Sequence, residues 1–308
     1  MTTAVNQTRE KLTDYINTTK RSQSAIAKEL GISGAALSQF LSSSYIGSNE
    51  DIADKIEQFF ELDKKRKLCT PPPRFTKELN NTKLVYNALS YIQITNGIAT
   101  IVGTAGSGKT TAMKHFADEH NGVLYVQADA TKKSPRAALR LIAKAMGVKT
   151  CSTASDTLDK LIEELTGTGK VIIIDEAQHL TERSFDTLRA INDRACVGLI
   201  YAGTPDIIAR MYGRHEAELD QVHSRIGYVC KLNNRYKLED IENVFSEFKL
   251  NKTIIKQLYN ISSRKGGLRL AINLFKFAND LAVTAEEPLD IKHIEYAAKC
   301  VGNGGGIL

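Results

Sequence analysis

The segment Gly103–Thr110 constrains the fold of this chain more strongly than any other feature. Its sequence is GTAGSGKT; it follows the apolar run Ile98–Val102, and a helical pattern begins at Lys109. A strand, a turn of the pattern G-x-x-x-x-G-K-[ST] and a helix, in this order, are typical of a loop that wraps around phosphate groups. The glycines let backbone N–H groups point at a phosphate, and the helix N-terminus adds positive potential. The segment therefore predicts an α/β fold that binds ATP or GTP.

The stretch around this loop alternates between short apolar runs and amphipathic segments. We predict strands at 98–102, 123–126, 171–174 and 197–202, with helices from 109, around 137–146, around 158–165 and at 205–211. Strands that alternate with helices form a parallel sheet covered on both faces. Residues 93–232 are therefore predicted to be the ATPase core.

Two polar residues of the loop are predicted to bind the nucleotide through their side chains. Lys109 would reach the β- and γ-phosphates, and the Thr110 hydroxyl would be a ligand for Mg²⁺. The remaining contacts are assigned to Gly103, Thr104, Ala105, Gly106, Ser107, Gly108 and Thr111. The predicted cofactors are therefore ATP and Mg²⁺.

Further polar residues stand at the ends of two predicted strands. Asp175 and Glu176 follow the apolar run 171–174, at the end of a strand where ligands bind in open α/β sheets. We predict that Asp175 holds Mg²⁺ and that Glu176 deprotonates the attacking water. Thr204 follows the next strand and is predicted to touch the γ-phosphate or that water. Both sites have a plainer alternative, because these residue types also suit helix N-termini.

Arginines near the end of the core form the next candidate group. An ATP site at a subunit boundary needs an arginine from the neighbouring chain to balance the γ-phosphate charge. Arg225 is the predicted finger, and Arg210 and Arg214 are rivals that spacing alone does not rank. Arg269 stands at a helix start in the last part of the chain and is predicted to reach back over the γ-phosphate. For Arg225 the alternative is a surface position, and for Arg269 it is a solvated position at a helix start.

The first 69 residues have the pattern of short helices. Residues 24–30 form an apolar-faced helix that ends at a glycine, and Ser33 is placed to cap the next helix. This arrangement is typical of a helix-turn-helix DNA-binding domain. Ser38 and Gln39 would face the DNA groove, but the presumed recognition helix has no Arg or Lys, so weak or nonspecific DNA contact is expected. A helical module for protein contact is the alternative.

Other segments complete the predicted organisation. Residues 70–92 form a linker and a leading helix, because consecutive prolines favour an extended chain. Residues 233–308 form a helical lid, with helices predicted at 238–248, 252–263, 267–284 and 290–300. Within the first part, Asn49 is predicted to cap a fourth helix.

A basic cluster follows the second predicted strand. Lys132, Lys133 and Arg136 stand close together, and we predict that they follow a DNA backbone. A solvated helix start is the alternative. Gln178, just after the acidic pair, is a candidate relay from DNA to the predicted catalytic base.

Composition matches that of an ordinary soluble protein. The chain carries 41 basic and 35 acidic residues, a net charge of +6 that permits phosphate binding without demonstrating it. No apolar run approaches the ~18 residues of a membrane span, so no membrane partner is expected. The five cysteines are scattered, without the spacing of a metal site or a disulfide framework, and a cytoplasmic location is expected.

The combined motifs resemble the AAA+ ATPases over roughly residues 75–300. Within that class, the helix-turn-helix, the proline-rich linker at 71–75 and the small lid are similar to the transposition ATPase family of phage Mu. The resemblance implies an ATP-dependent helical oligomer on double-stranded DNA that selects target DNA and activates a transposase in a bacterial host cell. It implies hydrolysis stimulated by DNA or transposase, with Thr204 as sensor, Arg225 as finger and Arg269 as lid sensor.

Two other functions fit parts of the pattern. An ATP-regulated transcription regulator would use the helix-turn-helix to read an operator, although its recognition helix lacks the arginines that read bases. A related ATPase of secretion or plasmid maintenance would have no DNA partner, and the helix-turn-helix argues against it.

Overall fold

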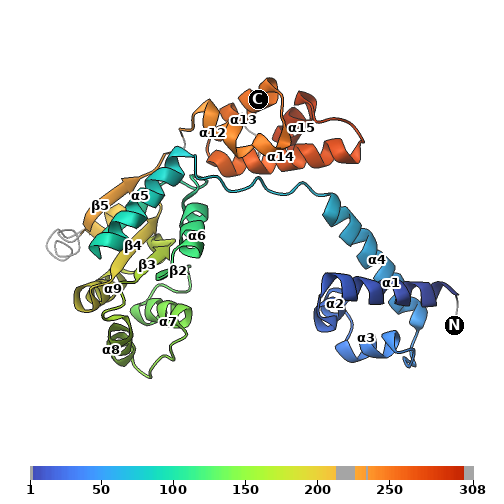
Figure 1. Ribbon diagram of the computed structural model, residues 1–308, viewed down its shortest axis with the longest axis horizontal. Coiled ribbons are helices and arrows are strands. Elements are labelled where there is room, and N and C mark those ends of the chain that lie inside the picture. The colour runs from blue at the N-terminus through green and yellow to red at the C-terminus, as the bar shows by residue number, and fades with distance from the viewer. Residues whose placement is uncertain (1–2, 213–225, 234, 302–308) are drawn as a thin grey trace. The chain divides into compact units, whose positions relative to one another are not determined.

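The computed structural model describes residues 3–212, 226–233 and 235–301. Contacts divide the chain into two compact units, the first made chiefly of residues 1–71 and the second of most of the remainder. Each unit has apolar cores of its own, and Figure 1 labels their elements.

The N-terminal unit consists of helices around one apolar core. The helices span Thr3–Thr19 (α1), Gln23–Glu29 (α2), Gly34–Leu41 (α3) and Asn49–Leu68 (α4). Serine hydroxyls cap α2, α3 and α4, because those of Ser22, Ser33 and Ser48 accept hydrogen bonds from backbone N–H groups of the first turn. The predicted cap at Asn49 was wrong: its side chain donates to two carbonyls of the preceding loop, and Ser48 is the cap.

The predicted helix-turn-helix segment folds as a pair of helices. Gly31 makes the turn with a φ of +66°, a left-handed conformation that glycine adopts without strain. Leu37 and Phe40 of α3 belong to the buried core, whereas Ser38 and Gln39 are exposed. The polar residues of α3 therefore face solvent, and DNA contact through them stays a prediction.

One parallel sheet organises the second unit. Its strands are Ile98–Val102 (β1), Val123–Gln127 (β2), Val171–Asp175 (β3), Gly198–Gly203 (β4) and Ile226–Lys231 (β5). The order is β2-β3-β4-β1-β5, and every neighbouring pair in it is parallel. The predicted parallel sheet is confirmed. Because the strands run the same way, the residues that follow β1, β3 and β4 meet at one edge.

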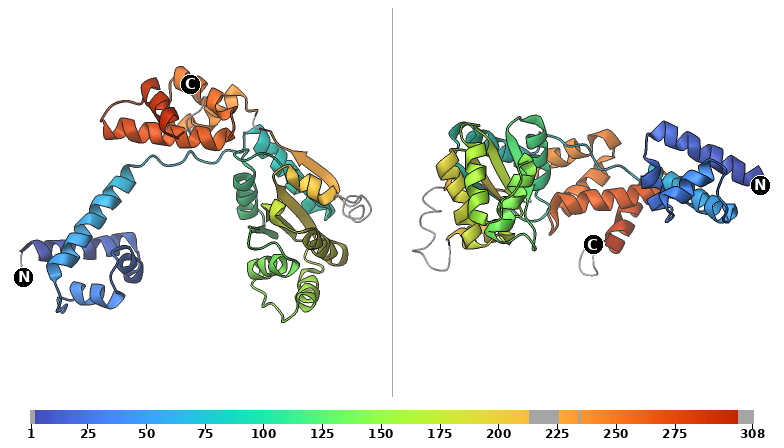
Figure 2. Two further views of the ribbon diagram at one scale, coloured as in Figure 1. Left: turned by 180° about the vertical axis from the view of Figure 1, so that it is seen from behind. Right: turned by 90° about the horizontal axis from the view of Figure 1, so that it is seen from below.

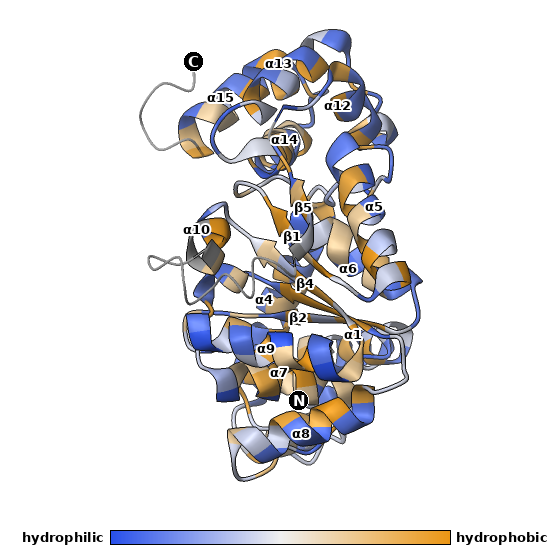
Figure 3. Cartoon of the chain, turned by 90° about the vertical axis from the view of Figure 1, so that its left-hand side faces the viewer, coloured by the Kyte–Doolittle hydropathy of each residue, from blue (hydrophilic) through white to orange (hydrophobic). Residues whose placement is uncertain are grey.

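Helices cover both faces of this sheet (Figures 1 and 2). One face packs against α7 (Pro135–Met146), α8 (Ala154–Leu165), α9 (Glu182–Ala195) and α10 (Asp206–Tyr212). The other face packs against α5 (Asn80–Thr95) and α6 (Lys109–Glu119). The strands are hydrophobic, and hydrophilic residues lie on the outer sides of the helices (Figure 3). The strands β1, β3 and β4 are buried throughout, which explains why they are continuous apolar runs rather than alternating ones.

A group of helices follows β5 and has its own apolar core. The helices are α12 (Leu238–Val244), α13 (Lys252–Ser262), α14 (Gly267–Thr284) and α15 (Ile291–Val301). The helix predicted at 238–248 is two elements, α12 and the 3-10 turn Ser246–Phe248 (η2). Phe245 ends α12 with φ −102° and ψ 13°, and its ring packs on Phe275 with the ring centroids 4.9 Å apart.

Two negative findings concern the described residues. No helix among them has the length and apolar character needed to cross a membrane. Over the same residues, no group of three or more His, Cys, Asp or Glu side chains is arranged to hold a metal ion.

Candidate nucleotide-binding site

A cavity of about 230 Å³ lies beside the loop that joins β1 to α6. Residues 105–111 line it together with Glu176, Gly203 and Thr204 from the ends of β3 and β4, and with Leu268, Arg269 and Ile272 of α14. The predicted loop, acidic residue, threonine and lid arginine therefore meet at a single cavity, although they come from distant parts of the sequence.

Gly106 allows the loop and the start of α14 to approach closely. Its φ is +84°, and a Cβ atom added there would lie 2.0 Å from the Gly266 carbonyl oxygen. The Tyr236 hydroxyl donates to the Gly106 carbonyl at 3.2 Å. Burial raises the pKa of Tyr236 to about 12, so this hydroxyl remains a donor at neutral pH. A side chain at position 106 would therefore push the loop away from the segment that carries Arg269.

Lys109 is held inside the loop by neutral partners. Its Nζ donates to the carbonyl oxygens of Gly103 at 2.6 Å and Thr104 at 3.1 Å, and to the Ser107 hydroxyl at 3.3 Å. Burial lowers the pKa of the Lys109 ammonium, and the carboxylates at the end of β3 act in the opposite direction. Charged phosphate oxygens are stronger acceptors than these neutral groups, so the arrangement suits a phosphate ligand.

Asp175 is fully buried and accepts several hydrogen bonds. The Thr110 hydroxyl donates to its Oδ2 atom at 2.6 Å, and the backbone N–H of Glu176 donates to its Oδ1 atom at 2.9 Å. A hydroxyl and a carboxylate are oxygen ligands of the kind that Mg²⁺ takes beside a nucleotide. These two side chains fit the ion, and they are the pair that the sequence predicted for it.

Tyr125 is a member of this site that the sequence patterns did not single out. Its hydroxyl donates to the Asp175 Oδ2 atom at 2.7 Å. Burial and the negative charge of Asp175 raise the pKa of Tyr125, so its hydroxyl stays protonated. Tyr125 is opposite Ile173 in the β2–β3 register, and only knowledge that β2 neighbours β3 would have drawn attention to it.

Gln178 links the ends of β3 and β4. Its side-chain N–H donates to the Glu176 carboxylate, and its Oε1 accepts from the Thr204 backbone N–H at 3.3 Å. A Cβ atom at Gly203 would lie 2.1 Å from the same Oε1 atom, so only glycine leaves room for this link. Glu176 has a φ of +55°, an uncommon value for a residue with a side chain that often occurs at functional sites. The amide thus restrains the predicted base.

The predicted arginines differ in how much of them the structure describes. Arg269 lines the cavity, as expected for a residue that reaches the nucleotide. Arg210 belongs to α10, but its side chain lies outside the described residues, as do Arg214 and Arg225 entirely. The identity of the finger therefore stays a prediction.

The predicted DNA-contacting residues of the core lie at the start of α7. Lys132 forms an ion pair with Asp129, whereas Lys133 and Arg136 are exposed. The Lys133 carbonyl accepts hydrogen bonds from the Thr181 backbone N–H at 3.1 Å and from the Ser184 hydroxyl at 2.6 Å. The chain at Lys133 is therefore hydrogen-bonded to the start of α9, the helix that follows the acidic end of β3.

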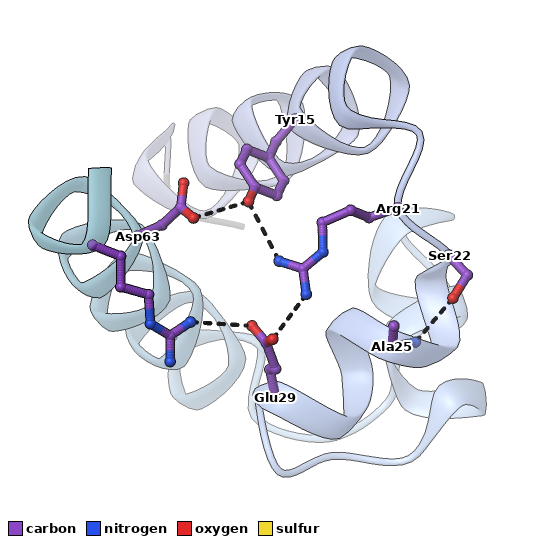
Figure 4. Close-up of polar contacts among 7 residues, drawn as sticks. Tyr15, Arg21, Ser22, Ala25, Glu29 and Asp63 are labelled. Carbon is purple, nitrogen blue, oxygen red and sulfur yellow. Dashed lines mark hydrogen bonds and ion pairs between the residues drawn. The ribbon is translucent and has the colours of Figure 1, made fainter. Parts of the chain in front are cut away.

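In the N-terminal unit, charged residues are paired with one another (Figure 4). Arg21 donates to Glu29 at 2.8 Å, and Arg66 of α4 lies 3.7 Å from the same carboxylate. The Tyr15 hydroxyl donates to Asp63 at 3.1 Å. These contacts join α1, α2 and α4, so Arg21 serves the fold of the unit.

Comparison with known proteins agrees with this site. A family model described as an AAA domain matches residues 92–211. The chain is 28% identical over 275 residues to the Mu-like prophage FluMu DNA transposition protein B of Haemophilus influenzae, covering 87% of this chain and 95% of that one. It is 25% identical over 256 residues to the ATP-dependent target DNA activator B of Escherichia phage Mu, covering 82% and 81%.

A solved structure of Drosophila ORC bound to DNA contains a chain that is 13% identical, with a TM-score of 0.49 and coverage of 80% of this chain and 74% of that one. Similarity at this level does not bear on function. The AAA match covers the strands and loop that carry the cavity, and the curated relatives align with most of the sequence. Residues 92–211 therefore match an AAA domain, and most of the chain is similar to the transposition B proteins of Mu-like phages.

Proposed function

We propose that this protein is an ATPase of DNA transposition that binds duplex DNA with little sequence preference, selects it as target and activates a transposase. The observation that carries the proposal is the cavity at which the loop, Glu176, Thr204 and Arg269 meet. The names of the relatives, DNA transposition protein B and ATP-dependent target DNA activator B, supply the process.

The proposed reaction is hydrolysis of ATP to ADP and phosphate. Lys109 and the loop N–H groups bind the phosphates, and Thr110 and Asp175 hold Mg²⁺, which supplies charge neutralisation when bound. Glu176 takes a proton from water as the water oxygen bonds to the γ-phosphorus and the bond from that phosphorus to the bridging oxygen breaks. Thr204 contacts the γ-phosphate or the water, and Arg269 contacts the γ-phosphate from the lid.

The proposed partners are duplex DNA, a transposase and further copies of this chain, inside the cytoplasm of a bacterial host cell. ATP would promote a helical oligomer on DNA. Arg225 of each neighbouring chain would balance the negative charge of the γ-phosphate. DNA and transposase would stimulate hydrolysis, which would end the assembly. Lys132, Lys133, Arg136, Ser38 and Gln39 are the proposed DNA-contacting residues.

Sedimentation with random duplex DNA tests this function. We expect the full chain to sediment with DNA only when ATP is present, without preference for sequence, and we expect DNA to increase the rate of phosphate release. Lys109→Ala should abolish both effects, because ATP then has no ammonium partner. Tight binding to one DNA site in the absence of ATP would contradict the proposal and would instead match a transcription regulator.

A further inference from the structure

The helix α7 and the loops at its two ends form a region of one charge sign. Between Asp129 and Asp156, residues 130–155 contain six basic residues and no acidic one. Residues 71–230 contain 19 basic and 17 acidic residues, so the rest of that stretch has 13 basic and 17 acidic residues. The positive charge of the core is therefore concentrated in this single segment. We name residues 130–155 the basic segment.

A hollow of about 790 Å³ lies in the basic segment, beside α7. Its lining includes Lys132, Arg140, Lys144 and Lys149. The hydroxyl-bearing residues Thr131 and Thr150 also line it, and among the described residues no carboxylate does. Arg140, Lys144 and Lys149 are exposed. These features match a polyanion better than a single small anion, because the cations are distributed around a wide, open surface.

The spacing along α7 favours a regularly charged partner. Arg136, Arg140 and Lys144 are four residues apart, so they lie on one side of the helix and advance by about 6 Å per step. Like charges at this spacing repel each other and destabilise a helix unless a ligand neutralises them. The phosphates of a nucleic acid strand form an evenly spaced row of negative charges, which can face such a row of cations.

We infer that the hollow beside α7 binds consecutive phosphates of one strand of duplex DNA, with Arg140, Lys144 and Lys149 extending the contact that Lys133 and Arg136 begin. This inference rests on the proposed function, since it assigns a second contact surface to the same DNA. Lys132 is paired with Asp129 and contributes less to the net charge at the mouth of the hollow. Phosphate contacts of this kind carry no sequence information, which agrees with binding to random DNA.

The salt dependence of DNA binding tests the inference. The affinity of the full chain for a random duplex in ATP is measured between roughly 50 and 200 mM salt. Each lost phosphate contact lowers the slope of log K against log salt by about 0.9, so Arg140→Ala with Lys144→Ala should lower it by about 1.8. The affinity ratio of wild type to this variant should then change about twelvefold across that range.

Two further variants separate charge from structure. Lys252→Ala with Lys256→Ala removes an exposed pair of the same spacing on α13 and should leave the slope unchanged. Arg140→Lys with Lys144→Arg keeps both charges and should retain the wild-type slope. The attraction between a cation and a phosphate does not require the planar, two-donor geometry of a guanidinium group. ATP hydrolysis without DNA should be equal in all four proteins, which shows that each is folded.

The outcomes are distinct. If wild type binds DNA and the alanine pair on α7 has the same slope and affinity, the hollow does not contact phosphate and the inference is wrong. An equal loss in the α13 pair also overturns it, because the effect would then be one of net charge. If wild type itself binds no random DNA with ATP, the proposed function has failed before the hollow is tested.

Discussion

The nucleotide site and the N-terminal unit use charged side chains in opposite ways. In the N-terminal unit, Arg21 is paired with Glu29, and Lys67 lies 2.8 Å from Asp63. In the nucleotide site, Glu176 and Arg269 line an open cavity, and the Lys109 ammonium donates to two backbone carbonyls and a hydroxyl, which are neutral groups. Paired charges hold helices together, whereas charges gathered around a cavity are available to a ligand.

The same contrast separates the two helices that are candidates for DNA contact. The exposed side of α3 carries Ser38 and Gln39 and no charge, so it offers hydrogen bonds but little attraction for phosphate. The exposed side of α7 carries Arg136, Arg140 and Lys144. Since phosphate contacts dominate the affinity for DNA of random sequence, α7 should contribute more of it than α3.

The largest effect is expected for Glu176→Gln. The amide has the same shape as the carboxylate but cannot take a proton, so the rate of hydrolysis should fall by at least about 100-fold. ATP binding remains, and DNA-bound assemblies should therefore persist. Phosphate release and sedimentation with DNA measure the two effects. Glu29→Gln in the N-terminal unit is the control and should hydrolyse ATP at the wild-type rate; rapid disassembly of the Glu176 variant would contradict its role.

A second effect is expected for Tyr125→Phe. Loss of the hydroxyl removes one of the donors that orient the Asp175 carboxylate. Outer partners of metal ligands typically alter metal affinity by about 10- to 100-fold, so the Mg²⁺ concentration for half-maximal hydrolysis should rise by about tenfold. Tyr201→Phe is a matched control, because that hydroxyl donates to the Phe185 carbonyl and should affect stability alone. An unchanged Mg²⁺ midpoint would show that Tyr125 does not support the metal site.

A third effect is expected for Gln178→Glu. The new carboxylate would stand beside Glu176, and a neighbouring like charge raises the pKa of a carboxyl group. The base that we propose, Glu176, would act only when ionised, so the acid limb of the pH–rate profile should move to higher pH while the KM for ATP stays within about twofold. Rates measured from pH 5 to 9 test this. A uniform loss at every pH would mean that Gln178 matters only for folding.

Much of the site could be predicted because several of its parts are short motifs of consecutive residues. The loop, its lysine and its threonine are consecutive residues, and Asp175 with Glu176 directly ends an apolar strand. Their roles in catalysis remain predictions, whereas their meeting at one cavity is observed. The parallel sheet was predictable for the same reason, since each strand is a continuous apolar run.

Some of the parts that escaped prediction involve contacts between residues that are distant in the sequence. Tyr125 reaches Asp175 only because β2 lies beside β3, and strand order is not visible in a pattern of apolar runs. The helix predicted at 238–248 is divided at Phe245, whose ring packs against Phe275 of α14. The cap at Ser48 instead of Asn49 is a shift of one residue, which adjacent cap-forming residues make hard to decide from sequence.

The smallest effect is expected in the N-terminal unit at acid pH. The hydrogen bond from Arg21 lowers the pKa of Glu29, and that from Lys67 lowers the pKa of Asp63. A carboxyl group with a lowered folded-state pKa stabilises the fold above its unfolded pKa, and this stability is lost as pH falls through the folded value. The stability of α1–α4, measured by hydrogen exchange in the full chain, should therefore decrease slightly as pH falls below about 4.5. In Glu29→Gln the decrease should be smaller, because one of the two titrating groups is gone. An equal decrease in both proteins would mean that the pairs in Figure 4 are too exposed to stabilise the unit, and the contrast with the nucleotide site would then concern availability to ligand alone.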